Sequence, residues 1–166
     1  IIQSVAYRLG GDAPSLKFPE PVALRDVQRL FPNAATVDER SDDDPFQPVR
    51  AKDGAVLGTV VRTAPDADAI MGYQGPSDAL MGFTPEKTVV GITMGATFES
   101  QRYADYVRED DDFTERHAGK TVDELAQVVG SRAWGDGVSG ATMTSGAVME
   151  GVVRKAKVLV APPEAP

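Results

Sequence analysis

Apolar and polar residues alternate through the middle of the chain in a pattern typical of β-strands. In residues 49–61, two such runs flank Asp53-Gly54, and a dipeptide of this kind between alternating hydrophobic residues is a strong signal for a β-hairpin. Residues 79–83 and 88–97 form two more strand-like runs, joined by the turn-like segment 84–87. The pattern therefore predicts antiparallel strands connected by short turns.

Helical spacing replaces this alternation near both ends of the chain. A short amphipathic helix is predicted in residues 21–31, before Pro32, and further helical faces contain residues 103–107 and 122–129. Thr121 and Glu124 fit a capping box for the latter. A long C-terminal helix is expected to begin near Thr144 or Ser145. Strands followed by helices, without regular alternation, predict an α+β fold in which helices flank an antiparallel β-sheet.

The length of the chain fits one domain. A chain of 166 residues buries about 70% of its extended surface on folding, which is enough for a single core. We expect an irregular lead-in over residues 1–20, a domain over residues 21–160 and a disordered tail over residues 161–166. The sequence begins Ile1-Ile2-Gln3 without an initiator Met, so we expect a trimmed or mature fragment, before which a membrane anchor is one alternative.

Charge and composition exclude several function classes. The formal net charge is −8, which argues against a nucleic-acid partner. The absence of Cys and the presence of one His exclude zinc ribbons, iron–sulfur ligation and a multi-His metal site within the chain. Acidic residues cluster at 42–44 and 109–112, but without the spacing of a calcium loop, so solvated loops are favoured over a metal site.

The segment with the most chemical information lies just before the C-terminal helix and reads Asp136-Gly137-Val138-Ser139-Gly140-Ala141-Thr142-Met143-Thr144-Ser145. Gly140 and Ala141 allow the backbone to approach a bulky group, and the hydroxyls and unpaired amides of a helix N-terminus suit a phosphate. The alternative is an ordinary N-cap, which the residues alone favour.

Ser139-Gly140-Ala141-Thr142, preceded by Asp136, resembles the flavinylation motif of the FMN-binding domain family. This family includes flavin subunits of sodium-pumping NADH:quinone oxidoreductases and Rnf-type electron-transport complexes, and the N-terminal region of nitrous-oxide-reductase maturation proteins. The resemblance extends from about Val22 to the C-terminal helix, through the Asp53-Gly54 hairpin and residues 72–76.

The resemblance implies that Thr142 carries FMN through a phosphoester, made by a separate magnesium-dependent flavin transferase that uses FAD and releases AMP. Ser139, Gly140 and Ala141 would then serve recognition and close approach, and Asp136 would help the transferase to dock or would activate the hydroxyl. Hydrogen bonds to the phosphate are expected from Thr144 and Ser145.

Other residues are expected near the flavin ring. Tyr73, which follows Gly72, would line the flavin, with core packing as an equal alternative. Glu99 matches the acid of the family's Glu-Thr-Pro-Gly loop, although the Pro-Gly turn is missing here. For three further residues the ordinary structural role is favoured, namely packing for Trp134, an exposed position for Arg102, and a surface or capping position for His117.

The resemblance implies an electron-transfer flavoprotein domain, matured by a flavin transferase. It would exchange electrons with a membrane redox protein on the extracytoplasmic face of the cytoplasmic membrane. The alternative is a module that binds FMN non-covalently or senses redox state. A hydrolase is disfavoured, because Gly137-Val138-Ser139-Gly140-Ala141 is one residue short of a nucleophile elbow and His117 precedes Ser139.

Overall fold

The computed structural model describes residues 22–41, 43–64, 66, 70, 72, 75–128 and 138–161. The predicted lead-in over residues 1–20 and most of the predicted tail lie outside the described residues. None of the helices in the described ranges combines the length and the apolar character that crossing a bilayer requires.

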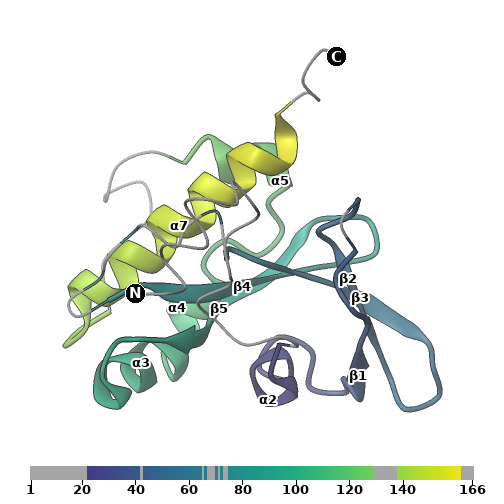
Figure 1. Ribbon diagram of the computed structural model, residues 1–166, viewed down its shortest axis with the longest axis horizontal. Coiled ribbons are helices and arrows are strands. Elements are labelled where there is room, and N and C mark those ends of the chain that lie inside the picture. The colour runs from purple at the N-terminus through teal and green to yellow at the C-terminus, as the bar shows by residue number, and fades with distance from the viewer. Residues whose placement is uncertain are drawn as a thin grey trace, which may run out of the picture.

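A five-stranded antiparallel sheet forms the centre of the domain, with the strands in sequence order β1-β2-β3-β4-β5 (Figure 1). The predicted hairpins at Asp53-Gly54 and at 84–87 are both confirmed, and Gly54 has the positive φ of 89° that a tight turn requires. The strands are β1 (Thr36–Val37), β2 (Gln47–Arg50), β3 (Val56–Arg62), β4 (Ser77–Phe83) and β5 (Val89–Thr97).

The helices confirm the α+β prediction, with differences at their ends. The Thr121–Glu124 capping box is present at α5. The first helix is only four residues long, because Arg29 and Leu30 donate to carbonyls three residues earlier and so tighten the turn. The C-terminal helix begins at Thr142, earlier than predicted. The helices are α2 (Leu24–Val27), α3 (Gln101–Arg108), α4 (Asp111–Glu115), α5 (Val122–Ala126) and α7 (Thr142–Val160).

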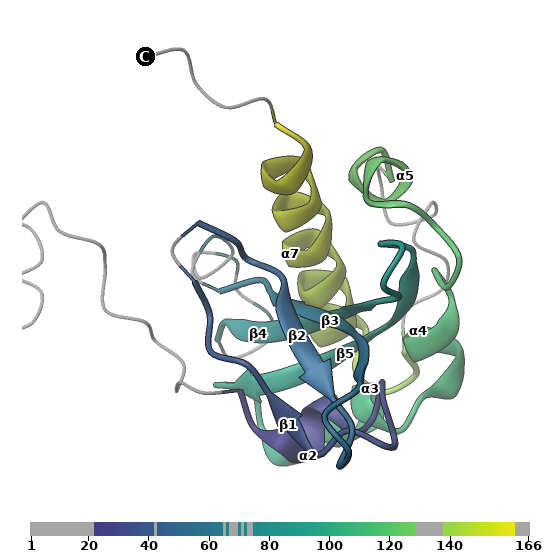
Figure 2. The same ribbon diagram turned by 90° about the vertical axis from the view of Figure 1, so that its right-hand side faces the viewer.

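Each face of the sheet is covered by a different part of the chain. The long helix α7 crosses one face, where Met81, Ile92 and Val152 belong to the larger hydrophobic core. The short α2 lies on the other face, as both views show (Figures 1 and 2). Gly82 allows this close packing, because a Cβ there would lie 3.1 Å from side-chain carbons of both Leu30 and Phe31.

The end of β5 and the beginning of β4 lie side by side. Ser77 pairs with Thr97 in the sheet register, and their hydroxyl oxygens are 2.6 Å apart. The chain then passes almost directly into α3, whose N-cap Ser100 accepts a hydrogen bond from the Tyr103 amide. This short connection brings α3 and the residues after β5 toward the N-terminal end of α7.

Candidate functional site

The N-terminus of α7 is formed by a tight turn without a side-chain cap. Gly140 has a φ of 83°, and a Cβ there would approach the Tyr106 ring to 2.9 Å. The N-cap residue is Ala141, and no side chain hydrogen-bonds to the first amides of the helix in the way a cap does. The ordinary N-cap interpretation of this Ser/Thr-rich segment is therefore wrong for the described structure.

Two of the hydroxyls in this segment are used inside the protein. Ser145 is buried, and its hydroxyl accepts a hydrogen bond from the Val138 amide at 3.1 Å and donates one to the Thr142 carbonyl at 3.2 Å. Thr144 is also buried, and its hydroxyl donates to a carboxyl oxygen of Glu99 at 2.7 Å. Both side chains hold the first turn of α7 in place.

The other two hydroxyls are open to solvent. Ser139 and Thr142 are exposed, and neither side chain hydrogen-bonds to any of the described residues. Of these two, Thr142 lines a pocket and Ser139 does not. Thr142 is therefore the one exposed hydroxyl-bearing residue of the described segment that also belongs to the pocket wall.

The backbone amides at this helix end are available to a ligand. Ser145 is the first residue of α7 whose N–H bonds within the turn, to the Ala141 carbonyl. The N–H groups of Thr142, Met143 and Thr144 have no acceptor among the described residues. Unpaired amides at the positive end of a helix of 19 residues favour an anion, and a phosphate in particular.

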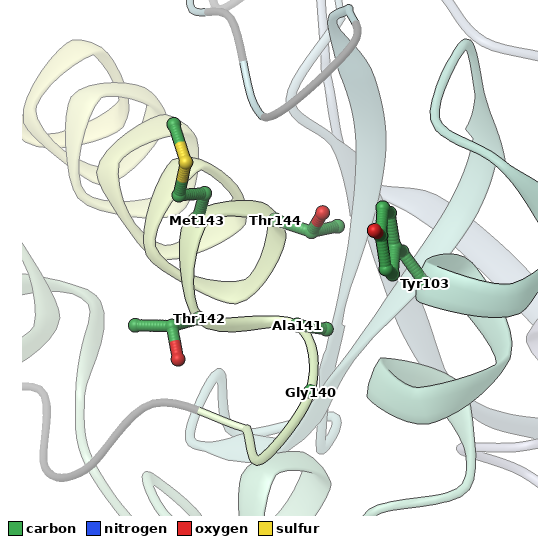
Figure 3. Close-up of a pocket in the computed structure, with 6 residues that line it drawn as sticks. All are labelled: Tyr103, Gly140, Ala141, Thr142, Met143 and Thr144. Atoms are coloured by element: carbon green, nitrogen blue, oxygen red, sulfur yellow. The ribbon is translucent and has the colours of Figure 1, made fainter.

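A pocket of about 240 Å³ opens at this helix end (Figure 3). In the close-up, the Thr144 side chain points toward the Tyr103 ring, while Thr142 and Met143 project to other sides of the first turn. The volume is below the roughly 300–1,000 Å³ of sites that enclose a whole small ligand, so this pocket suits one end of a nucleotide. Its lining residues are Tyr103, Gly140, Ala141, Thr142, Met143 and Thr144.

Glu99 and Gly72 meet beside this pocket. Glu99 is only 6% exposed and accepts the hydrogen bond from Thr144. A Cβ on Gly72 would lie 2.0 Å from the same carboxyl oxygen, so no side chain fits at position 72 while Glu99 keeps this place. The structure thus brings together Gly72, Glu99 and Thr144. Where the family's Pro-Gly turn is missing, Ser100 begins α3 instead.

Helix α3 supplies a pocket residue that the sequence analysis did not identify as one. The sequence pattern places Tyr103 on one face of a helix and gives it no role at the site, whereas in the structure it lines the pocket. One signal was available in the sequence. Tyr103 lies three residues before Tyr106 on the same helix, and the Tyr106 ring packs beside Gly140 of the motif. Arg102 is exposed as predicted, and its Nε donates to the Tyr106 hydroxyl at 3.0 Å, which raises the pKa of the guanidinium.

His117 does not lie where the sequence predicted. It is 3% exposed rather than a surface or capping residue, and neither ring nitrogen has a hydrogen-bond partner among the described residues. Burial lowers the pKa of His117, and the nearby positive charges of Lys120 and Arg116 lower it further. The turn after α4 carries this side chain into the interior, and it is not among the pocket-lining residues.

Acidic residues do not gather into a metal site in the part of the chain that the structure describes. Asp110 is the N-cap of α4 and accepts from the Phe113 amide at 2.8 Å, while Asp112 forms an ion pair with Arg116. The cluster at 109–112 thus begins a helix rather than forming a loop alone. Three residues of the sequence hypothesis, Tyr73, Trp134 and Asp136, lie outside the described residues.

Comparison with known proteins identifies the family to which the chain belongs. Residues 72–157 match the FMN-binding domain family, and this range includes Gly72, Glu99, α3 and the first turn of α7. The chain is also 32% identical over 153 residues to Protein NirI of Paracoccus denitrificans (strain Pd 1222), covering 85% of this chain and 21% of that protein. The chain thus spans about a fifth of the length of that relative. From the match over more than half of its length, and from a helix end that suits a phosphate, the chain belongs to the FMN-binding domain family and is a flavoprotein domain.

Proposed function

We propose that this domain carries FMN covalently, through a phosphoester on Thr142, and that it relays electrons between redox partners. The proposal extends the family assignment from binding of FMN to its attachment and use. Three features support it, namely the Ser139-Gly140-Ala141-Thr142 sequence, the pocket at Thr142 and the unpaired amides beside it.

The accessibility of the Thr142 hydroxyl is the observation that carries the proposal. A modifying enzyme must reach the oxygen, and the oxygen must be free to form a new bond. The hydroxyls of Thr144 and Ser145 are buried and hydrogen-bonded, whereas Thr142 is exposed at the pocket. Ser139 is exposed but lies outside the pocket lining, so Thr142 is the best acceptor of the four.

The attachment step balances as a phosphoryl transfer from FAD. The Thr142 oxygen would attack the phosphorus of the FMN half of FAD and form a new oxygen–phosphorus bond. The bond from that phosphorus to the bridging oxygen would break, and the bridging oxygen would leave as part of AMP. The hydroxyl proton passes to a base, which we assign to the flavin transferase or to Asp136. The helix amides of Thr142, Met143 and Thr144 stabilise the negative charge of the product phosphate.

Bound FMN supplies the redox chemistry, and the protein supplies its position, shielding and electrostatic environment. Among the residues that the structure describes, those that line the pocket contain no pair of acid and base groups that could turn over a substrate. An electron carrier fits these features better than a self-sufficient enzyme. We further propose a membrane-associated partner and an extracytoplasmic location with an N-terminal anchor, and for these the resemblance to the family is the support.

Mass spectrometry of protein coexpressed with a flavin transferase tests the attachment. The unsubstituted protein should gain the mass of one FMN less one water, and Thr142→Val should gain nothing, because it keeps the shape of the side chain but lacks the oxygen. Ser139→Ala is the matched control, since it removes a neighbouring exposed hydroxyl that is not the acceptor and should retain at least part of the adduct.

Acid precipitation separates covalent from non-covalent binding. Covalent flavin should remain in the protein pellet, whereas flavin held only by contacts would appear in the supernatant. An adduct of undiminished yield on Thr142→Val would overturn the assignment to this residue. Yellow protein with an unmodified mass would favour the alternative of a non-covalent FMN module.

A further inference from the structure

Three segments that are distant in the sequence meet around the carboxyl group of Glu99. Gly72 lies on one side, where it donates its amide hydrogen to the Gly75 carbonyl at 2.9 Å and leaves room for the carboxylate. The first turn of α7 lies on the other side, where Thr144 donates its hydroxyl to Glu99. The amide of Glu99 itself donates to the Thr97 hydroxyl at 2.9 Å, which fixes its backbone to the end of β5.

We propose that Glu99 sets the reduction potential of the bound FMN, acting as a fixed negative charge in the wall of the pocket. This inference rests on the proposed use of the pocket for FMN, and it adds a role that attachment alone does not require. Glu99 is a positioning and tuning residue here, because it acts on the cofactor through space and through Thr144.

Glu99 lies close enough to the pocket for its charge to act on a bound ligand. Thr144 lines the pocket and also holds the carboxylate at 2.7 Å, so a single side chain separates Glu99 from the space in which the ligand lies. The hydrogen bond from Thr144 and the close packing against Gly72 both restrict where the carboxylate can move. The charge is therefore held at one place rather than averaged over many.

Burial makes this charge effective. Charges that water does not surround interact several times more strongly than charges on the surface, because the protein interior has a lower effective dielectric constant. Glu99 is 6% exposed, in contrast to the exposed carboxylates elsewhere on the chain. Reduction adds electrons to the cofactor, and a fixed negative charge nearby opposes that addition. Glu99 should therefore lower the reduction potential.

Glu99→Gln measures this effect, because it removes the charge and keeps an oxygen that can accept the Thr144 hydrogen bond. We expect a more positive midpoint potential for FMN-loaded protein in a spectroelectrochemical titration. Glu150→Gln is the matched control, since it makes the same change at an exposed position on α7, the helix that carries Thr144, and should leave the potential unchanged. The shift should persist at ~1 M salt, where charges at the surface are screened within about 3 Å.

Gly72→Ala provides an independent test that changes no charge. The added methyl group would lie 2.0 Å from the carboxyl oxygen, so the carboxylate must leave its place beside Thr144. The potential should rise, by less than in Glu99→Gln. If Glu99→Gln folds but takes up no FMN, the potential of Gly72→Ala tests the role of Glu99 instead.

Intact mass, measured first, separates failure of this inference from failure of the proposed function. If the unsubstituted protein takes up no FMN in the presence of the transferase, the proposed function fails. If it is loaded and Glu99→Gln has the potential of Glu150→Gln, or a more negative one, the role of Glu99 is overturned. An unchanged potential in loaded Gly72→Ala would contradict the role in the same way.

Discussion

Four hydroxyls near the start of α7 look equivalent in the sequence, and their surroundings give them different roles. Ser145 and Thr144 are buried and fix the first turn, while Thr142 and Ser139 face solvent. The motif indicated Thr142, but sequence alone could not show that Thr144 is already bonded to a residue 45 positions away. The partner of a side chain is set by tertiary packing, which short-range patterns do not report.

Replacing Ser145 tests the structural role of its hydroxyl. Ser145→Ala leaves the Val138 amide buried without its acceptor, and an unsatisfied buried donor costs about 1–3 kcal/mol. We expect the free energy of unfolding, measured with urea on protein without flavin, to fall by that amount. Ser139→Ala, at an exposed position, should change it by less than about 0.5 kcal/mol. Equal effects of the two substitutions would contradict this role.

His117 should make the stability of the protein depend on pH. Burial lowers its pKa in the folded state below the ordinary value of 6.5, so the unfolded chain binds the proton more readily. The contribution of neutral His117 to the free energy of unfolding is fully present above pH ~6.5. It is lost as the pH falls toward the lower pKa of His117 in the folded state.

Urea unfolding at about pH 7.5 and about pH 5.5 tests this effect, because the interval spans the ordinary pKa of histidine. The unsubstituted protein should lose more stability over the interval than His117→Gln, which cannot titrate. Equal losses would show that His117 does not carry the dependence. The charges of Lys120 and Arg116 are the same in both proteins, so they do not account for a difference.

At the scale of elements, the sequence predicted correctly the turns and helix caps that depend on residues close together in the chain. The Asp53-Gly54 turn and the Thr121–Glu124 capping box each depend on residues within a few positions, and both are confirmed. The start of α7 was placed too late, because hydroxyl residues are usual caps and here the turn at Gly140 replaces a cap. The role of Tyr103 required knowledge of how α3 packs against α7.

Two glycines near the start of α7 should respond in opposite ways to alanine. Gly140→Ala puts a Cβ on a residue with a φ of 83° and 2.9 Å from the Tyr106 ring, so it should lower the free energy of unfolding by at least ~1–2 kcal/mol. Gly146→Ala has no atom within 4 Å of its added Cβ and lies inside the helix. It should raise stability by about 0.5–1 kcal/mol. Thermal or urea unfolding of the two variants checks this. A Gly140→Ala variant as stable as the unsubstituted protein would contradict the described turn, and destabilisation by Gly146→Ala would contradict the open space at position 146.

At the scale of the molecule, the pocket is assembled from the C-terminal half of the chain. The family match over residues 72–157 contains Gly72, the end of β5, α3 and the start of α7. The strands β1, β2 and β3 lie before that range. With α2 and the residues after it they supply most of the second hydrophobic cluster on the opposite face of the sheet, which Leu80 of β4 completes. The sequence predicted both halves as one α+β domain, because strand and helix patterns can be recognised from the sequence without knowing which residues lie close together in space.

The central claim is that the Thr142 oxygen carries FMN. Trypsin cleavage after Arg132 and Arg154 releases a peptide of residues 133–154 that contains the whole motif. For protein coexpressed with a flavin transferase, fragmentation of this peptide should locate the mass of one FMN, less one water, on Thr142. The same peptide with an unmodified mass, or with the FMN on Ser139, Thr144 or Ser145, would contradict the account.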